Sequence, residues 1–227
     1  MPFSAETLDF LVENRIQNSR EWYHAHKDTF QKVVLQPMRE LVEYLTPAIN
    51  EIDPLLICEP KVDRSISRVY RDTRFSKDKS LYREVMWCMF VRDKREFSCS
   101  PGLFFEFSPD GFRYGGGYYH TPTKTMEAAR ELILEKDKTF QRALQAYEKQ
   151  EVFELEGDMY KRPHYPDQPE RLRSWLERRN IGFLHNSEDF ELLFSEDLPQ
   201  VLERGFRLLK PMHEFLCAAE ERAKNNE

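Results

Sequence analysis

The segment over 102–119 constrains the fold of this chain more than any other part of the sequence. Leu103, Phe105 and Phe107 recur with a period of two, so an extended strand places all three side chains on one face. A Pro-Asp-Gly sequence follows at 109–111, and it suits a tight turn because proline fixes φ and glycine accepts positive φ. The pattern therefore predicts a β-hairpin over 102–119 with its turn at 109–111.

Two further strands are predicted in addition to this hairpin. The stretch 85–91 consists of seven consecutive apolar residues between charged ones, which is typical of a central strand covered on both faces. The stretch 181–184, Ile-Gly-Phe-Leu, is short and apolar, and we expect an edge strand there. Together these segments predict an antiparallel or mixed sheet.

Both ends of the chain have the periodicity of helices. Ser4 can cap a first helix, a second can begin near Ser19, and Pro37 fits the first turn of a third. Near the other end, a helix from about Leu198 should be kinked or interrupted at Pro211, because proline removes a backbone donor. The sequence thus predicts a single α+β domain over 1–227, in which helices pack on one side of the sheet and form the N- and C-terminal regions.

Charge and composition exclude several classes of function. The net charge of −6 makes nonspecific binding of nucleic acid unfavourable. The longest apolar run, 85–91, is too short to cross a bilayer, and the first residues lack a signal-peptide pattern, so we expect no membrane association. None of the four cysteines forms a C-x-x-C pair, and we expect a cytoplasmic protein with reduced thiols. The sequence indicates no oligomeric state.

Charge is concentrated in the segment from Lys61 to Glu84. This segment has eight basic and four acidic residues, so it carries +4 while the rest of the chain carries −10. Guanidinium groups pair well with carboxylate and phosphate, and the tyrosines between them offer stacking surface. We therefore hypothesise an anion-binding site in which arginines bind the ligand, Asp72 orients them or accepts a proton, and a tyrosine forms a wall. Its candidate residues are Arg68, Tyr70, Arg71, Asp72, Arg74, Lys79 and Tyr82.

The same segment has two other interpretations. Its arginine and aspartate residues can hold a long loop in place without any ligand. It can also belong to a non-catalytic interaction module for an acidic or nucleic-acid partner. A concave pocket where 68–82 meets 115–120 would favour an anionic small molecule, whereas a flat basic stripe would favour the module.

Three consecutive glycines, Gly115, Gly116 and Gly117, form the second candidate feature. They permit close approach of the backbone to a ligand, and they equally permit the hairpin to bend around packed aromatic side chains. They have neither the P-loop spacing nor the G-x-G-x-x-G pattern.

The sequence identifies no catalytic residue, metal ligand or cofactor site. The histidines form no H-E-x-x-H motif, and His24 and His26 would lie on opposite sides of a helix. No G-x-S-x-G motif occurs, and Cys88 lies within an apolar run as a small hydrophobic residue. We therefore expect a site without metal or other cofactor, and the sequence leaves open whether the protein is an enzyme.

The charged segment also carries a resemblance to a known family. The run R-V-Y-R-D-T-R-F-S-K-D-K-S-L-Y-R at 68–83 resembles the signature of the uncharacterised family catalogued as domain of unknown function 2461. The stretches 10–27, 102–119 and 157–169 are similar to that family's opening, Gly-rich hairpin and late K-R-P element. The family more often has proline at Leu81 and often has lysine at Arg83. The resemblance implies one α+β domain and no particular activity.

Overall fold

A computed structural model describes residues 3–74, 76–93, 95 and 99–226 of the chain. Within these residues, five strands form one antiparallel sheet with the order β1-β2-β3-β5-β4. The strands are β1 (Met86–Phe90), β2 (Gly102–Ser108), β3 (Gly111–Gly117), β4 (Glu154–Glu156) and β5 (Gly182–Ser187). The predicted α+β class is confirmed, and the sheet is antiparallel.

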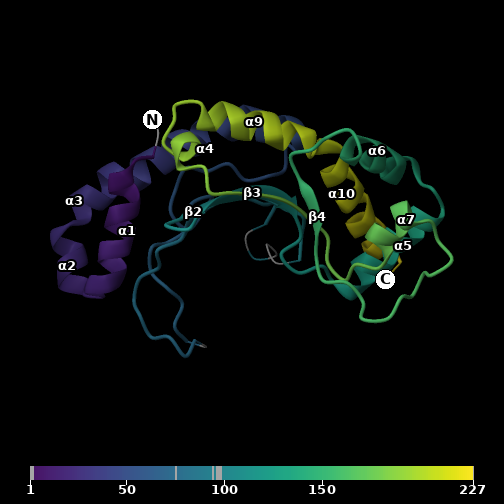
Figure 1. Ribbon diagram of the computed structural model, residues 1–227, viewed down its shortest axis with the longest axis horizontal. Helices are drawn as coiled ribbons and strands as arrows, with labels where there is room; N and C mark the ends of the chain where they lie inside the picture. The colour runs from purple at the N-terminus through teal and green to yellow at the C-terminus, as the bar shows by residue number, and fades with distance from the viewer. Residues whose placement is uncertain (1–2, 75, 94, 96–98, 227) are drawn as a thin grey trace.

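Helices lie at both ends of this sheet and over one of its faces, as Figure 1 shows. The N-terminal helices are α1 (Ala5–Gln17), α2 (Arg20–Ala25), α3 (Lys27–Phe30), the π-helical η1 (Gln31–Leu35) and α4 (Gln36–Ile52). The later helices are α5 (Thr123–Leu134), α6 (Lys138–Tyr147), α7 (Glu170–Leu176), α8 (Phe190–Leu193), α9 (Leu198–Leu208) and α10 (Lys210–Asn225). None of the helices in the described part of the chain has the length and apolar character that crossing a membrane requires.

The local signals at the helix ends act as predicted. Ser4 and Thr7 form a reciprocal capping box at the start of α1, and the Ser19 hydroxyl accepts a hydrogen bond from the Trp22 amide at the start of α2. Pro37 lies in the first turn of α4. Pro211 lies in the first turn of α10 and separates it from α9, because a proline amide cannot continue the hydrogen-bond ladder of the preceding helix.

The central hairpin is confirmed. Strands β2 and β3 pair from Gly102↔Gly117 to Ser108↔Gly111, and residues 109–110 connect them. Gly111 has a φ of 135°, and a Cβ there would collide with the Ser187 carbonyl oxygen of β5. Glycine is required at this position for both reasons.

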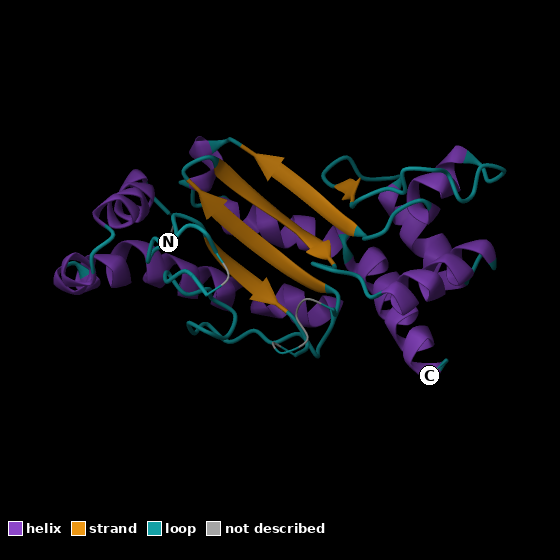
Figure 2. Ribbon diagram, turned by 90° about the horizontal axis from the view of Figure 1, so that it is seen from below, coloured by secondary structure: helices purple, strands orange, loops and turns teal. Residues whose placement is uncertain are grey.

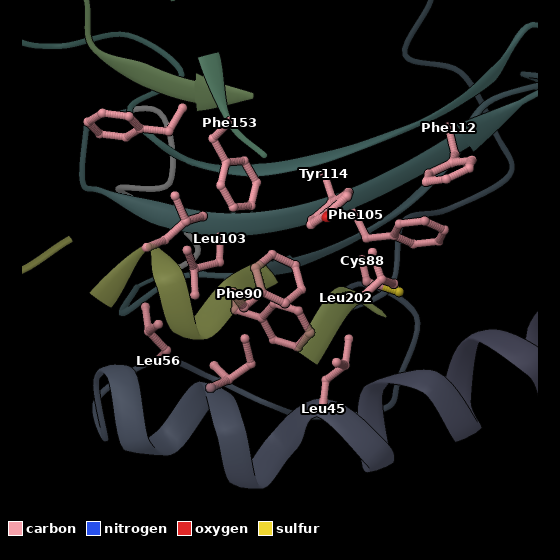
Figure 3. Packing of buried hydrophobic residues seen from close by; sticks show 14 of the residues in the cluster. Leu45, Leu56, Cys88, Phe90, Leu103, Phe105, Phe112, Tyr114, Phe153 and Leu202 are labelled. Carbon is pink, nitrogen blue, oxygen red and sulfur yellow. The ribbon is translucent and has the colours of Figure 1, made fainter. Parts of the chain in front are cut away.

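One face of the sheet forms the core. Phe105 and Phe107 of β2 are fully buried together with Phe90 of β1. Figure 3 shows Leu45 of α4 and Leu202 of α9 on the same side of the sheet as Phe90 and Phe105. Helix α9 approaches β3 so closely that a Cβ at Gly205 would lie 2.5 Å from the Tyr114 ring. Burial of these aromatic and aliphatic side chains is the main stabilising contribution to the fold.

The predicted positions of two strands are wrong. The stretch 85–91 forms β1, which lies at an edge of the sheet, and only alternate residues of β1 are buried, while Trp87 and Met89 are partly exposed. The run looked like a central strand because its partly exposed side chains, Trp87 and Met89, are apolar like its buried ones. The stretch near 181–184 belongs to β5, which lies between β3 and β4 instead of at an edge.

The opposite face of the sheet carries the side chains that point away from the core. Trp87, Glu106 and Arg113 lie in one cross-strand row, and Met89, Phe104 and Gly115 lie in the next. Figure 2 views the sheet from this side, with helices lying behind the strands. We call this surface the open face.

The two faces are expected to respond differently to truncation. Phe105→Ala should lower the free energy of unfolding by about 3–5 kcal/mol, because it leaves a cavity between the sheet and its helices. Phe104→Ala, at the neighbouring half-buried position on the open face, should cost less than half as much. Urea denaturation of both variants measures the difference, and equal losses would contradict the assignment of the two faces.

Candidate functional site

The charged segment folds back on itself beside the edge of β1. Ser67 donates its amide hydrogen to the Trp87 carbonyl oxygen at 2.9 Å, and Met89 donates to the Ser65 carbonyl oxygen at 2.8 Å. Further along, Arg71 donates to the Leu81 carbonyl oxygen at 2.8 Å. The backbone therefore pairs 69–71 with 81–83 and leaves 72–80 as the connection between them.

Tyr82 anchors this segment to the N-terminal helices. Its side chain is fully buried, and its ring centroid lies 5.0 Å from that of Tyr70 and 5.1 Å from that of Tyr23 in α2. Burial, followed by the neighbouring Tyr70, raises the pKa of Tyr82 well above its usual range. The sequence analysis treated Tyr82 as a wall for a ligand, but the structure places it in the core, and only Tyr70 remains exposed.

Arg71 belongs to a network that holds the connection against α1. Its Nη1 lies 3.0 Å from Oδ2 of Asp78, and Nη2 of Arg15 in α1 lies 2.8 Å from the same oxygen. The amide and hydroxyl of Ser80 donate to the other carboxylate oxygen of Asp78 and lower its pKa to about 2, with smaller contributions from Arg15 and Arg71. These contacts match the interpretation in which Arg71 fixes a loop.

The remaining charged candidates make contacts within the segment. Arg74 forms a bidentate pair with Asp72, and this pairing lowers the pKa of Asp72 to about 2. Lys79 donates from Nζ to the Thr73 carbonyl oxygen at 2.7 Å. Arg68 lies on the surface with Nε 3.1 Å from Oδ1 of Asp63. Exposed ion pairs of this kind contribute little to stability.

Arg83 differs from these arginines, although the sequence analysis did not include it among the candidate site residues. It donates from Nη2 to the Tyr70 carbonyl oxygen at 2.8 Å, and its guanidinium carbon lies 4.5 Å from the centroid of the Trp87 ring. Within the described part of the chain, its buried Nε has no hydrogen-bond partner and its guanidinium group makes no ion pair. Burial, followed by the nearby Arg68 and Arg71, lowers the pKa of Arg83.

The Arg83 side chain links the charged segment to the open face. Trp87 lies on that face in the row of Glu106 and Arg113. Arg113 donates from Nε to Glu106 at 2.7 Å, and its guanidinium carbon lies 5.8 Å from the Phe104 ring centroid. Arg83 thus makes no ion pair among the described residues, although the nearby Asp72 offsets part of the lowering of its pKa. It lies beside a surface that also carries aromatic rings and the Arg113–Glu106 pair.

The three glycines are part of the sheet and do not lie in a ligand loop. Gly115, Gly116 and Gly117 pair with β2 on one side and with β5 on the other. A Cβ at Gly116 would lie 2.5 Å from the Leu103 side chain, and one at Gly115 would collide with the Phe183 carbonyl oxygen. These contacts match the interpretation in which the glycines let the hairpin bend and pack.

The described residues of 68–82 do not meet those of 115–117, so a pocket between 68–82 and the glycines, which would have favoured a small-molecule ligand, is not observed there. The charged segment borders the outer edge of β1, whereas β3, with the glycines, lies beyond β2. The structure brings Arg83 close to Arg68, Arg71 and Tyr70. The three glycines lie apart from this group.

A second polar cluster contains residues that the sequence analysis did not single out. It lies beside a cavity of about 560 Å³ and consists of Asp53, Arg92, His213 and Cys217. A local pattern could have indicated only its His213 and Cys217 part, four residues apart, because Asp53 and His213 are 160 positions apart in the chain. Burial raises the pKa of the Cys217 thiol to about 12, so the thiolate is disfavoured at neutral pH.

These features define an α+β protein with one helix-covered sheet face, one open face and, beside the open face, an arginine that makes no ion pair among the described residues. The chain belongs to the family described as a conserved hypothetical protein, DUF2461, whose model matches residues 6–215. The resemblance of the run at 68–83 to that family is confirmed. A search of curated proteins finds none that matches the chain.

The network around Asp78 gives a prediction about pH. Since the folded-state pKa of Asp78 is about 2 and the unfolded value is roughly 4, its carboxylate stabilises the fold above pH 4. That contribution is lost as pH falls from roughly 4 toward 2. Asp78→Asn should therefore be less stable than the parent at pH 7 and equally stable near pH 2, as measured by urea denaturation.

Asp72→Asn is the matched control for this prediction. Asp72 has a similarly low pKa, but its partner Arg74 is two residues away on the exposed surface. A pair so local persists partly in the unfolded chain, so its loss should change stability much less. Equal effects of the two substitutions at pH 7 would show that the link from Asp78 to α1 contributes nothing.

Proposed function

We propose that the protein binds an anionic small molecule at the site formed by Arg83, Arg68, Arg71 and Tyr70, next to Trp87. The observation that carries this proposal is the Arg83 guanidinium group, which is partly buried, has a donor without a partner and makes no ion pair within the described residues. A buried charge is costly unless an opposite charge or hydrogen bonds compensate for it. A bound anion would supply both.

The neighbouring groups suit an anion with a planar or apolar part. Arg68 is exposed, so its guanidinium group can turn from Asp63 toward a ligand. Arg71 adds positive charge at a position fixed by Asp78. Trp87 supplies an aromatic surface, and the exposed part of Tyr70 supplies a second one.

The alternative of an interaction module for an acidic or nucleic-acid partner requires an extended basic stripe. Among the described strand residues of the open face, however, Arg113 is the only basic one, and it pairs with Glu106. These strands therefore form no basic stripe, which favours a small ligand. The ligand roles of Asp72, Arg74 and Lys79 remain predictions, and those residues would lie at the outer side of the site.

Titration with inorganic phosphate tests the proposal. Arg83→Met retains a side chain that can pack on Trp87 but removes the charge. The dissociation constant for phosphate should rise at least about tenfold, in keeping with the roughly 1.5–3 kcal/mol of a hydrogen bond to a charged group. Isothermal titration calorimetry measures it. The melting temperature of the unliganded variant should equal or exceed that of the parent, because an uncompensated charge has been removed.

Two control variants separate charge from folding. Arg83→Lys keeps the positive charge and should retain part of the affinity. Arg142→Met removes an exposed arginine of α6 that faces Glu214, and it should leave phosphate binding unchanged. The proposal is wrong if the parent shows no phosphate binding, or if Arg83→Met binds phosphate as well as Arg142→Met does.

A further inference from the structure

Three side chains with metal-binding atoms meet where α4 ends against α10. His213 and Cys217 are four residues apart on α10 and therefore project from one face of that helix. Asp53 directly follows α4 in an extended conformation, with φ −153° and ψ 111°. Asp53 and His213 are 4% and 3% exposed, and Cys217 is partly buried.

The distances between the three donor atoms fit one metal ion. Oδ2 of Asp53 lies 3.0 Å from Nε2 of His213, and Sγ of Cys217 lies 3.4 Å from the same nitrogen. All three atoms are within 4.8 Å of one another. Around a tetrahedral zinc ion, bonds of about 2.0–2.3 Å place neighbouring ligand atoms roughly 3.3–3.7 Å apart. The two distances from Nε2 of His213 are close to these separations, and the third pair, Asp53 and Cys217, lies within 4.8 Å.

Nε2 of His213 is the common neighbour of the other two donor atoms. If Nε2 of His213 is protonated, it donates to Asp53 and cannot accept a hydrogen bond from the Cys217 thiol. If Nε2 is unprotonated, it can accept from the thiol but then faces a carboxylate oxygen. A metal ion would accept a lone pair from all three atoms at once.

The same geometry excludes a nucleophilic triad. In such a triad the carboxylate binds Nδ1 of the histidine, so that Nε2 is free to take a proton from the nucleophile. Here Asp53 and Cys217 both face Nε2. Nδ1 of His213 is buried and has no hydrogen-bond partner among the residues that the structure describes.

Other groups hold the Asp53 carboxylate in position. Arg92 donates from Nε to Oδ2 of Asp53 at 2.6 Å, and the Leu55 amide donates to Oδ1 at 3.0 Å. Hydrogen bonds of this type orient the carboxylate ligands of metal ions. The cavity of about 560 Å³ lies against the cluster and is also lined by Pro54, Glu214, Glu221 and Lys224.

We propose that Asp53, His213 and Cys217 bind one zinc ion whose fourth position faces this cavity. A set of one oxygen, one nitrogen and one sulfur ligand suits zinc better than magnesium or calcium, which prefer oxygen ligands. Three protein ligands and an accessible fourth position are the arrangement of zinc sites that bind a water molecule or a substrate. The sequence analysis expected no metal because it tested only the C-x-x-C and H-E-x-x-H patterns and the His24 and His26 pair, and it did not consider His213 together with Cys217.

This site is independent of the proposed anion site. Arg83 precedes β1, whereas Arg92 follows it, so the two sites lie at opposite ends of that strand. Loss of zinc binding and loss of phosphate binding can therefore be measured separately.

Cobalt(II) titration of chelator-treated protein tests the proposal with a spectroscopic signature. One equivalent of Co²⁺ should give a thiolate-to-metal charge-transfer band in the near ultraviolet and intense tetrahedral bands in the visible region, and Zn²⁺ should displace them. Cys217→Ser should lose the charge-transfer band and raise the dissociation constant for Zn²⁺ at least tenfold. This substitution is nearly isosteric, and circular dichroism checks that the variant folds.

The matched control is Cys58→Ser, which removes another partly buried thiol and should keep both the band and the affinity for Zn²⁺. Asp53→Asn and His213→Gln should weaken Zn²⁺ binding as Cys217→Ser does. The proposal is overturned if the parent gives no charge-transfer band with Co²⁺. It is also overturned if the band persists in Cys217→Ser or disappears in Cys58→Ser.

Discussion

Packing of one face of the β2–β3 hairpin against α4 and α9 is the interaction on which the rest of the structure depends. The period-two spacing of Leu103, Phe105 and Phe107 places their side chains on this face, and Gly205 lets α9 approach the Tyr114 ring. Because the helices gather over this face, the opposite one, which carries Trp87 and Phe104, remains without helices in front of the strands (Figure 2). The candidate anion site exists because the charged segment pairs with the outer edge of β1, beside that open face.

The charged segment combines two roles that its sequence does not separate. Tyr82 and Asp78 attach it to the N-terminal helices, the first by ring packing and the second by ion pairs with Arg15 and Arg71. Arg83 has no such partner among the described residues and lies over Trp87. A rigid attachment of this kind would hold the cationic group in place before a ligand arrives, which lowers the entropic cost of binding.

The parts of the fold that could be predicted from the sequence are those that local signals determine. The turn at 109–111, the cap at Ser4 and the break at Pro211 each depend on residues within one turn or hairpin. The edge position of β1 could not be predicted, because Trp87 and Met89 are apolar although they face outward. The three residues of β4 are too few to show an alternating pattern. The sequence could not show that Arg83 makes no ion pair among the described residues, since tertiary contacts decide which arginines meet a carboxylate. Of the second cluster, only the i, i+4 spacing of His213 and Cys217 on one helix could be read from the sequence, because Asp53 comes from a distant segment.

The central claim is that Arg83 is the cation that meets an anionic ligand. Nitrogen-15 NMR of the arginine Nε–H groups during a phosphate titration tests it most directly, because the buried Nε of Arg83 has no hydrogen-bond partner among the residues that the structure describes. The claim predicts that the Arg83 Nε–H resonance shifts saturably with phosphate, while that of Arg142 does not move. An unchanged Arg83 resonance at saturating phosphate would contradict it.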